Sequence, residues 1–362
     1  MARQPPVGGR ALPATATKRA SRPWRRLAVG VALGYAAFLL VYAIAEWLFG
    51  QPVVSGRVSG LSSALALMAT FEPFLLLPLL LCLGLALLAR SRLALVALAV
   101  AALPFVLYYL PLFLPRLPAP ASSRTVTVMT HNILAANRES DRLAETILSQ
   151  DADIVALQEL VGNHAARLAP KLAATYPYRV IYADQGLGLY SRYPLRDAQL
   201  LTLGAEGSYA IRAVVDLPGG PVTVFNAHPR HPRIDWTPGA GSLLYVANFD
   251  PSRRDRAVAS LVSAIDRVKG PVIVLGDLNL PDRSGAYRQL TEYLKDAHRE
   301  AGWGLGYTFP EGLVGGRFWT PFPFLRIDYV LHSPEIRALE ARPGPPSGSD
   351  HLPVVARLGL PG

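Results

Sequence analysis

Cysteine and acidic residues are scarce in this sequence. Its 362 residues contain one Cys, and 26 Asp and Glu stand against 36 Lys and Arg. The single Cys82 excludes a disulfide-stapled scaffold, and neither a Cys cluster nor a His-x-x-x-His spacing indicates a zinc site. Because 51% of the residues are hydrophobic, an intrinsically disordered or collagen-like chain is also excluded.

Acidic residues are missing altogether from residues 1–26, which hold seven Lys and Arg. This segment supplies most of the net charge of +10, and residues 121–362 carry a net charge of only +1. A DNA-binding domain usually has a basic surface of its own. The basicity therefore indicates membrane topology rather than nucleic-acid binding.

Long apolar runs occur only in the N-terminal third of the chain. Each has about the ~20 residues that cross ~30 Å of hydrocarbon, so we predict three transmembrane helices. They cover residues 27–49, 67–89 and 93–115. Glu46 and Glu72 are expected near the outward ends of their helices, where a carboxylate can reach water.

The distribution of Lys and Arg predicts the orientation of these helices. The basic tail 1–26 and the hairpin at Arg90 and Arg92 should be cytoplasmic, and the loop 50–66 should lie outside. Three crossings then place the rest of the chain on the extracytoplasmic face of the cell membrane. The predicted parts are a basic tail (1–26), a membrane domain (27–115), a Pro-rich linker (116–124) and a catalytic domain (125–362).

Strand-like and helix-like segments alternate after residue 124, which indicates a layered α/β architecture. Strands are predicted at 125–130, 153–159, 178–183, 187–192, 209–217, 221–227, 271–277, 326–332 and 352–358. Helices are predicted at 139–149, 163–174, 252–268 and 284–299.

Two long segments, 231–251 and 303–324, are predicted as loops rich in aromatic residues. Loops of this length in a compact domain are commonly functional. Aromatic side chains suit a membrane–water interface. Packing against the edge of the domain itself is the alternative interpretation.

Polar residues at the ends of the predicted strands carry the chemistry. Asp277 and Asn279 are two residues apart, so extended geometry would place both side chains on one face, where they could orient a water molecule and hold a phosphoryl oxygen. Glu159 and Asp350 are hard oxygen ligands that suit Mg²⁺ or Mn²⁺. These components are the ones that metal-assisted phosphoester hydrolysis needs.

Histidines complete the predicted site. His228 and His351 can transfer protons or donate to a phosphate oxygen, and Asp328 can orient an imidazole. The other histidines are expected outside the site, with His131 and His231 as bystanders and His164, His298 and His332 at the surface.

The ordered motifs resemble the endonuclease/exonuclease/phosphatase superfamily over residues 125–358. They are THN (130–132), QE (158–159), YSRYP (190–194), NAH (226–228), GDLN (276–279), RIDY (326–329) and SDH (349–351). The resemblance implies a four-layer α/β/β/α sandwich, with two mixed sheets between helices, preceded here by the three transmembrane helices.

The resemblance also implies a role for each matching residue. Glu159 would be the principal metal ligand, with Asp350 and Asn132 beside the metal. Asp277 would align the water, and Asn279 would stabilise the transition state. His228 would contact the phosphate, and His351, paired with Asp328, would act on the phosphate or as a base. Asn132 and Arg192 would contact substrate. Residues 133–136 contain no second acidic ligand, which favours a one-metal site with Mg²⁺ or Mn²⁺.

The predicted function is that of a membrane-anchored phosphoester hydrolase acting on lipid-linked phosphates or diphosphates. The chain looks like bacterial membrane members of the superfamily that have three spans and are associated with resistance to envelope antibiotics of the teicoplanin and vancomycin type. The predicted partners are the lipid bilayer and a phosphorylated substrate, without an obligate protein partner. An extracytoplasmic nuclease acting on DNA and a catalytically inactive scaffold are the alternatives.

Overall fold

The computed structural model describes residues 23–54, 59–116, 124–204, 207–238, 244–314 and 318–361. Contacts divide the chain into two units. One unit contains the chain up to Leu39 together with Leu77–Ala102, and the other contains Leu40–Leu76 and everything from Leu103 onward. Most of the predicted tail and linker lies outside the described residues.

Apolar helices form the N-terminal third of the chain. They are α1 (Pro23–Phe49), α2 (Gly60–Thr70), α3 (Glu72–Leu75), α4 (Leu77–Leu88), α5 (Arg92–Tyr109) and the 3₁₀ helix η1 (Leu110–Phe113). By length and composition, α1 and the continuous segment Arg92–Phe113 could each cross a membrane, in agreement with the first and third predicted spans.

The second predicted span is interrupted near Phe71. The chain bends by 85° between α2 and the following segment Glu72–Leu88, so the described chain has two candidate spans, or three if the bent pair is counted as one. Pro73 lies in the first turn of α3, where its ring cannot continue a preceding helix. Before the bend, α2 contacts a segment far along the chain, since the hydroxyl of Ser63 on α2 donates to the carbonyl of Phe249 at 2.7 Å.

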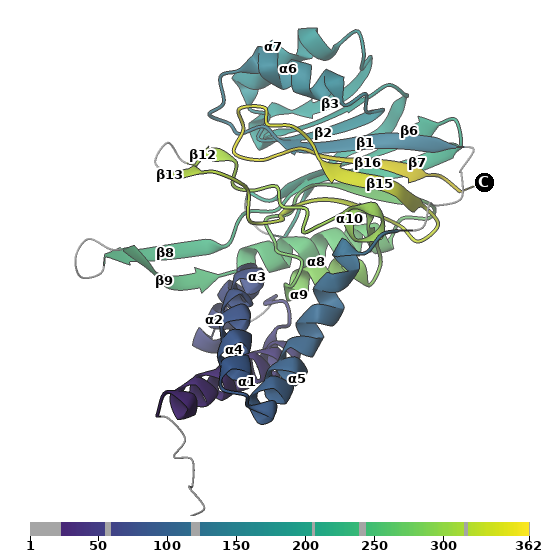
Figure 1. Cartoon of the computed structure of the whole chain (residues 1–362). Coiled ribbons are helices and arrows are strands. Elements are labelled where there is room, and N and C mark those ends of the chain that lie inside the picture. Colours follow the sequence, from purple (N-terminus) through teal and green to yellow (C-terminus); the bar gives the residue numbers. More distant parts are fainter. Residues whose placement is uncertain are drawn as a thin grey trace, which may run out of the picture. The chain divides into compact units, whose positions relative to one another are not determined.

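Two six-stranded sheets lie face to face in the larger unit (Figure 1). The first has the order β15 (Arg337–Pro343), β16 (Val354–Gly359), β1 (Thr125–Asn132), β2 (Ile154–Gln158), β4 (Leu187–Ser191), β3 (Tyr178–Tyr182). The second has the order β11 (Lys295–Asp296), β14 (Asp328–His332), β10 (Val272–Asp277), β7 (Gly220–His228), β6 (Tyr209–Leu217), β5 (Leu195–Thr202).

Helices cover the outer faces of both sheets, which confirms the predicted four-layer sandwich (Figure 1). The helices α6 (Ser140–Ser149) and α7 (Gly162–Leu172) lie on the first sheet, and α8 (Ser252–Asp266) and α9 (Gly285–Thr291) lie on the second. The short α10 (Ala297–Ala301) contacts β14 and β15.

Alternation of apolar side chains holds the central strands between the layers. On β2, Ile154 and Ala156 join the core between the two sheets, while Val155 and Leu157 join the core beneath α6 and α7. Successive side chains of a strand point to opposite faces, so a strand that is apolar throughout is buried on both sides. Packing on both faces therefore fixes where the central strands end, and with them the positions of the residues that follow.

Several segments differ from their predicted structure. The predicted helix 284–299 is divided into α9, β11 and α10. The predicted loop 231–251 contains a hairpin of β8 (Arg233–Pro238) and β9 (Leu244–Asp250), and 303–324 contains a hairpin of β12 (Gly312–Val314) and β13 (Phe318–Thr320). Each hairpin is a separate two-stranded sheet outside the two large sheets, so the pattern that predicts a core strand does not apply to it.

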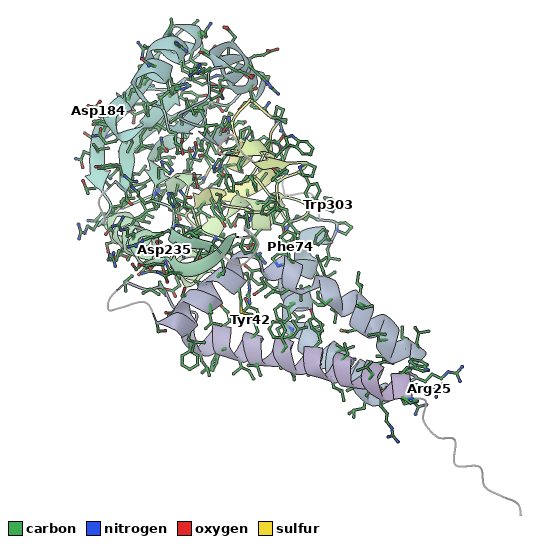
Figure 2. All side chains as sticks on the ribbon, turned by 90° about the vertical axis from the view of Figure 1, so that its left-hand side faces the viewer. Arg25, Tyr42, Phe74, Asp184, Asp235 and Trp303 are labelled. Carbon is green, nitrogen blue, oxygen red and sulfur yellow. The ribbon has the colours of Figure 1, made fainter. Side chains whose placement is uncertain are left out.

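Glu46 and Glu72 are buried rather than open to water, which corrects the expectation from sequence. Glu72 is fully buried, and its carboxylate accepts hydrogen bonds from Tyr42 (2.8 Å) and Tyr109 (3.0 Å), with Tyr42 labelled in Figure 2. Arg283 Nε lies 2.8 Å from Glu72 Oε1. Arg288 on α9 lies 2.5 Å from Glu46 Oε1. Arginines more than 200 residues away in the chain thus satisfy both carboxylates, and spacing along the sequence does not reveal such pairs.

The Glu72–Arg283 pair leads to a test of stability. Arg283→Met would leave a buried carboxylate without its counter-ion, and we expect the chain to lose about 3–5 kcal/mol of stability. Thermal unfolding of the full chain in detergent measures this loss. Arg142→Met, which removes only an exposed pair with Glu139, should leave the midpoint unchanged. Equal midpoints for the two variants would contradict a stabilising role of the buried pair.

Candidate active site

The predicted site residues meet where the central strands of both sheets end. The pairs β1–β2 and β7–β10 are each parallel, and their carboxyl ends carry Asn132, Glu159, His228 and Asp277. Asp328 begins β14 and lies opposite Asp277 in the antiparallel register. Polar side chains from both sheets thus face one another at a single edge of the sandwich.

Asp277 is the centre of this cluster. Asn132 Nδ2 donates to Asp277 Oδ2 at 3.0 Å and to Glu159 Oε1 at 3.1 Å, so one amide joins a carboxylate from each sheet. His228 Nε2 lies 3.6 Å from Asp277 Oδ2, and His351 Nε2 lies 3.8 Å from the same oxygen. Glu159 also accepts from the backbone N–H of Ala135 at 2.8 Å.

A turn, and not an extended strand, brings Asn279 back to Asp277. Asn279 has a φ of 53°, and its backbone N–H donates to Asp277 Oδ1 at 2.9 Å. Its side-chain amide donates to Asp277 Oδ2 at 3.3 Å. Glu159 also has a left-handed φ, of 56°. Non-glycine residues hold this conformation at a cost and are concentrated at functional sites.

Gly276 lets β10 approach β7 closely at this point. A Cβ atom on Gly276 would lie 2.0 Å from the carbonyl oxygen of Ala227. Any larger residue would push Asp277 away from the neighbouring His228. The glycine of the GDLN motif is therefore required by packing.

Asp328 orients His351. Asp328 Oδ2 accepts from His351 Nδ1 at 2.9 Å and from the hydroxyl of Thr308 at 2.6 Å. This bond leaves the Nε2 edge of the imidazole directed at Asp277. The ring of Phe309 packs against the His351 ring at a tilt of 41°, with the ring centroids 4.6 Å apart. Thr308 and Phe309 are not among the predicted site residues, because they lie in a segment that the sequence predicts as a long aromatic loop, either at the membrane or packed against the edge of the domain.

The charges of the cluster shift its pKa values. Burial alone would lower the pKa of His351, but Asp328, Asp277 and Asp350 raise it to about 10. Burial opposes ionisation of Asp277, yet His351, His228 and Asn132 lower its pKa to about 2. Asp277 is therefore an ionised acceptor beside a protonated imidazole at neutral pH.

Asp350 lies among carboxylates. Burial is the main cause of its raised pKa, and the negative charges of Glu159 and Asp277 add to it. Asp277, Asp328 and His351 each offer a ligand atom, and these atoms lie within 4.8 Å of one another. Buried oxygen ligands with excess negative charge fit a divalent cation such as Mg²⁺ or Mn²⁺. Which carboxylates bind it, with Glu159 and Asp350 expected from sequence, stays a prediction.

Arg192 does not lie with the other predicted residues. It follows β4, which runs antiparallel to β2, so it lies at the end of the sheet opposite Glu159. There it pairs with Asp151 and lies 3.5 Å from Asp153. Its position gives no support to the prediction that Arg192 contacts substrate. The YSRYP motif places an arginine beyond a strand but does not show at which end of the sheet.

Four of the remaining histidines are structural. His164, His298 and His332 are buried, so their expected surface location is wrong. Each satisfies a partner within the fold, and His332 Nε2 lies 3.0 Å from Glu300. His131 is fully buried next to Ser347, and burial followed by the charge of His351 lowers its pKa to about 3. His131 is therefore neutral at physiological pH.

The fold and this cluster together define a hydrolase of phosphoesters. The chain belongs to the endonuclease/exonuclease/phosphatase family, whose model matches residues 129–351. No curated protein matches the chain by sequence.

Solved structures share the sandwich fold. An endonuclease/exonuclease/phosphatase from Bacteroides vulgatus is 21% identical, with a TM-score of 0.53 over 65% of this chain and 99% of that chain. A mannosyl-6-phosphatase from Bacteroides thetaiotaomicron is 17% identical, with a TM-score of 0.50 over 64% of this chain and 99% of that chain. At these identities the likeness shows the fold alone.

The Asp328–His351 pair leads to a kinetic test. In Asp328→Asn the amide cannot stabilise a protonated imidazole, and we expect kcat to fall by about 10²- to 10⁴-fold. Hydrolysis of a phosphoester by the full chain measures this effect. His231→Gln is the control, because the one hydrogen bond of the His231 ring to the described residues is with the carbonyl of the neighbouring Pro232. A kcat of Asp328→Asn equal to that of the control would show that the pair does not act in the reaction.

Metal binding can be tested without turnover. A cation that binds only the folded protein at about 100 times its Kd adds about 2.7 kcal/mol of stability. Mg²⁺ or Mn²⁺ should therefore raise the thermal midpoint of the wild type, and Glu159→Gln should reduce the shift. If the metals shift the Glu159→Gln midpoint as much as that of the wild type, Glu159 is not a ligand.

Proposed function

We propose that this chain is a membrane-anchored, divalent-metal-dependent phosphoester hydrolase that acts on lipid-linked phosphate or diphosphate outside the cytoplasm. The observation that carries the proposal is the cluster around the buried carboxylate of Asp277, where Asn132 and His351 lie beside Asp277 and the Asn132 amide also bonds Glu159. The same chain contains candidate spans, which would hold this cluster beside a lipid surface.

The geometry assigns a task to each residue. The ionised Asp277 accepts a hydrogen bond from the attacking water, directs its oxygen at the phosphorus and takes up the proton that the water releases as the new P–O bond forms. Asn279 Nδ2 donates to the carbonyl of Pro229 at 3.0 Å and to Asp277 Oδ2 at the longer distance of 3.3 Å. Exchanging the longer bond for one to a phosphoryl oxygen would let Asn279 stabilise the transition state. A divalent cation, when bound by the neighbouring carboxylates, supplies Lewis-acid stabilisation of the phosphate charge.

The histidines complete the proton transfers. His351 is protonated at neutral pH and faces the cluster through Nε2, so it can donate to a phosphate oxygen. Asp328 and Thr308 fix its ring. His228, which is partly exposed and 3.6 Å from Asp277, is placed to protonate the leaving oxygen.

Charge and topology support a lipid substrate over DNA. Residues 121–362 have almost no net charge, whereas DNA-binding surfaces neutralise several phosphates with Lys and Arg. The basic residues cluster before the first span, which by the positive-inside rule places the tail in the cytoplasm. Three crossings, with the bent pair of helices counted as one span, would then leave the catalytic part outside the cytoplasm. The candidate spans restrict the site to substrates near the membrane.

A substrate panel tests the proposed function. The full chain in liposomes, with Mg²⁺ or Mn²⁺, should release phosphate from a polyprenyl diphosphate and leave plasmid DNA intact. Chelation by EDTA should abolish the activity, and Asp277→Asn should lower it by about 10³-fold or more. Asp235→Asn, which changes an exposed carboxylate paired with Arg233, is the matched control.

Two results of this panel would contradict the proposal. Nicking of the plasmid without attack on the lipid would identify a nuclease. Failure to hydrolyse any phosphoester with any divalent metal would favour the scaffold alternative.

A further inference from the structure

The segment 303–324, called the aromatic segment below, carries the most exposed apolar side chains of the catalytic part. Trp303, Trp319 and Phe322 are 72%, 70% and 62% exposed. Among the described residues beyond 124, the other exposed large hydrophobic side chains reach no more than 42%. Soluble surfaces rarely keep such rings in water without a partner.

Both ends of the aromatic segment contact the apolar N-terminal helices. Trp303 packs edge-to-face on Phe113, the last residue of the candidate span Arg92–Phe113, with ring centroids 5.7 Å apart. The backbone N–H of Gly304 donates to the carbonyl of Leu112 at 2.8 Å. Figure 2 shows the Trp303 side chain projecting outward from the ribbon.

The C-terminal end of the aromatic segment also contacts the N-terminal helices through aromatic rings. The ring of Phe324 lies 6.5 Å from that of Phe71 and 6.0 Å from that of Phe74. These residues lie where the chain bends between α2 and α3. Phe322, two residues before Phe324, is therefore close to a helix end while its own ring faces solvent.

Between its two ends, the aromatic segment forms a wall of the active site. The Thr308 hydroxyl donates to Asp328, and the ring of Phe309 packs against that of His351. The backbone N–H of Glu311 donates to the carbonyl of Asp350 at 2.8 Å, and that of Leu352 donates to the carbonyl of Thr308 at 2.8 Å. One continuous segment thus touches both the helix ends and the catalytic histidine.

We propose that the exposed rings of Trp303 and Phe322 lie in the membrane–water interface, and that the active site takes a lipid-borne phosphoester from this interface. Tryptophan beside the end of a span is the arrangement that interfacial aromatic belts adopt. The bilayer is the favoured occupant because the exposed rings continue the aromatic contacts at the helix ends. The substrate part of this inference rests on the proposed function.

A contact measurement tests the position of the rings without any turnover. Cys82→Ser removes the single thiol of the chain, so Phe322→Cys can carry one fluorescent label. In nanodiscs of brominated phosphatidylcholine, this label should be quenched. A label at Tyr178→Cys, on strand β3 and 41% exposed, should not be quenched. An unquenched label at 322 would overturn the proposal, and so would a label protected there by a second copy of the chain.

A kinetic comparison tests the consequence for substrate. Trp303→Ser/Phe322→Ser should lower kcat/KM for a polyprenyl diphosphate in liposomes by about tenfold, which corresponds to ~1.4 kcal/mol. It should leave the hydrolysis of water-soluble geranyl diphosphate unchanged, and Tyr178→Ser should affect neither substrate. Equal losses on both substrates, or a loss on neither, would overturn the proposal.

The two measurements separate this inference from the proposed function. If the wild type hydrolyses neither diphosphate but the label at 322 is quenched, the proposed function fails and the bilayer contact is supported. If both diphosphates are hydrolysed but the label is not quenched, the proposed function stands and the bilayer contact is wrong.

Discussion

The hydrogen bonds from the Asn132 amide to Asp277 and Glu159 are the interaction on which the site depends. Asn132 belongs to the first sheet and Asp277 to the second, so this amide spans the seam of the sandwich. Apolar packing between the sheets holds the ends of the two strands next to each other. The buried carboxylate of Asp277 stays ionised because hydrogen-bond donors and a protonated imidazole surround it. Packing of apolar side chains thus sets the geometry of the site, and the neighbouring charges set the protonation state of Asp277.

A second set of buried charges attaches the ends of the N-terminal helices to the catalytic sandwich. Glu72 and Glu46 are satisfied by Arg283 and Arg288, which belong to the loop after Asn279 and to the helix that follows. A buried carboxylate without a counter-ion is costly, so the helix ends must lie where these arginines can reach the two glutamates. The catalytic part is therefore held at the helix ends by ion pairs as well as by the aromatic segment.

Residues at strand ends could be predicted from the sequence, whereas partners supplied by distant loops could not. The buried strands that lead to Glu159 and Asp277 are apolar on both faces. A polar residue at the end of such a strand is therefore recognisable in the sequence as a candidate site residue. Thr308 and Arg283 carry no such pattern, because each acts on a residue in another element. The position of Arg192 does not support its predicted role, because a motif beside a strand does not indicate the end of the sheet at which it lies.

A double-mutant cycle between Asn132→Ala and Asp277→Ala, measured on kcat/KM, tests the central claim most directly. If the two side chains act as one unit across the seam, the double variant should be little worse than Asp277→Ala alone. Losses that simply add would show that the two residues work independently and would contradict the convergence of both sheets on one reacting centre.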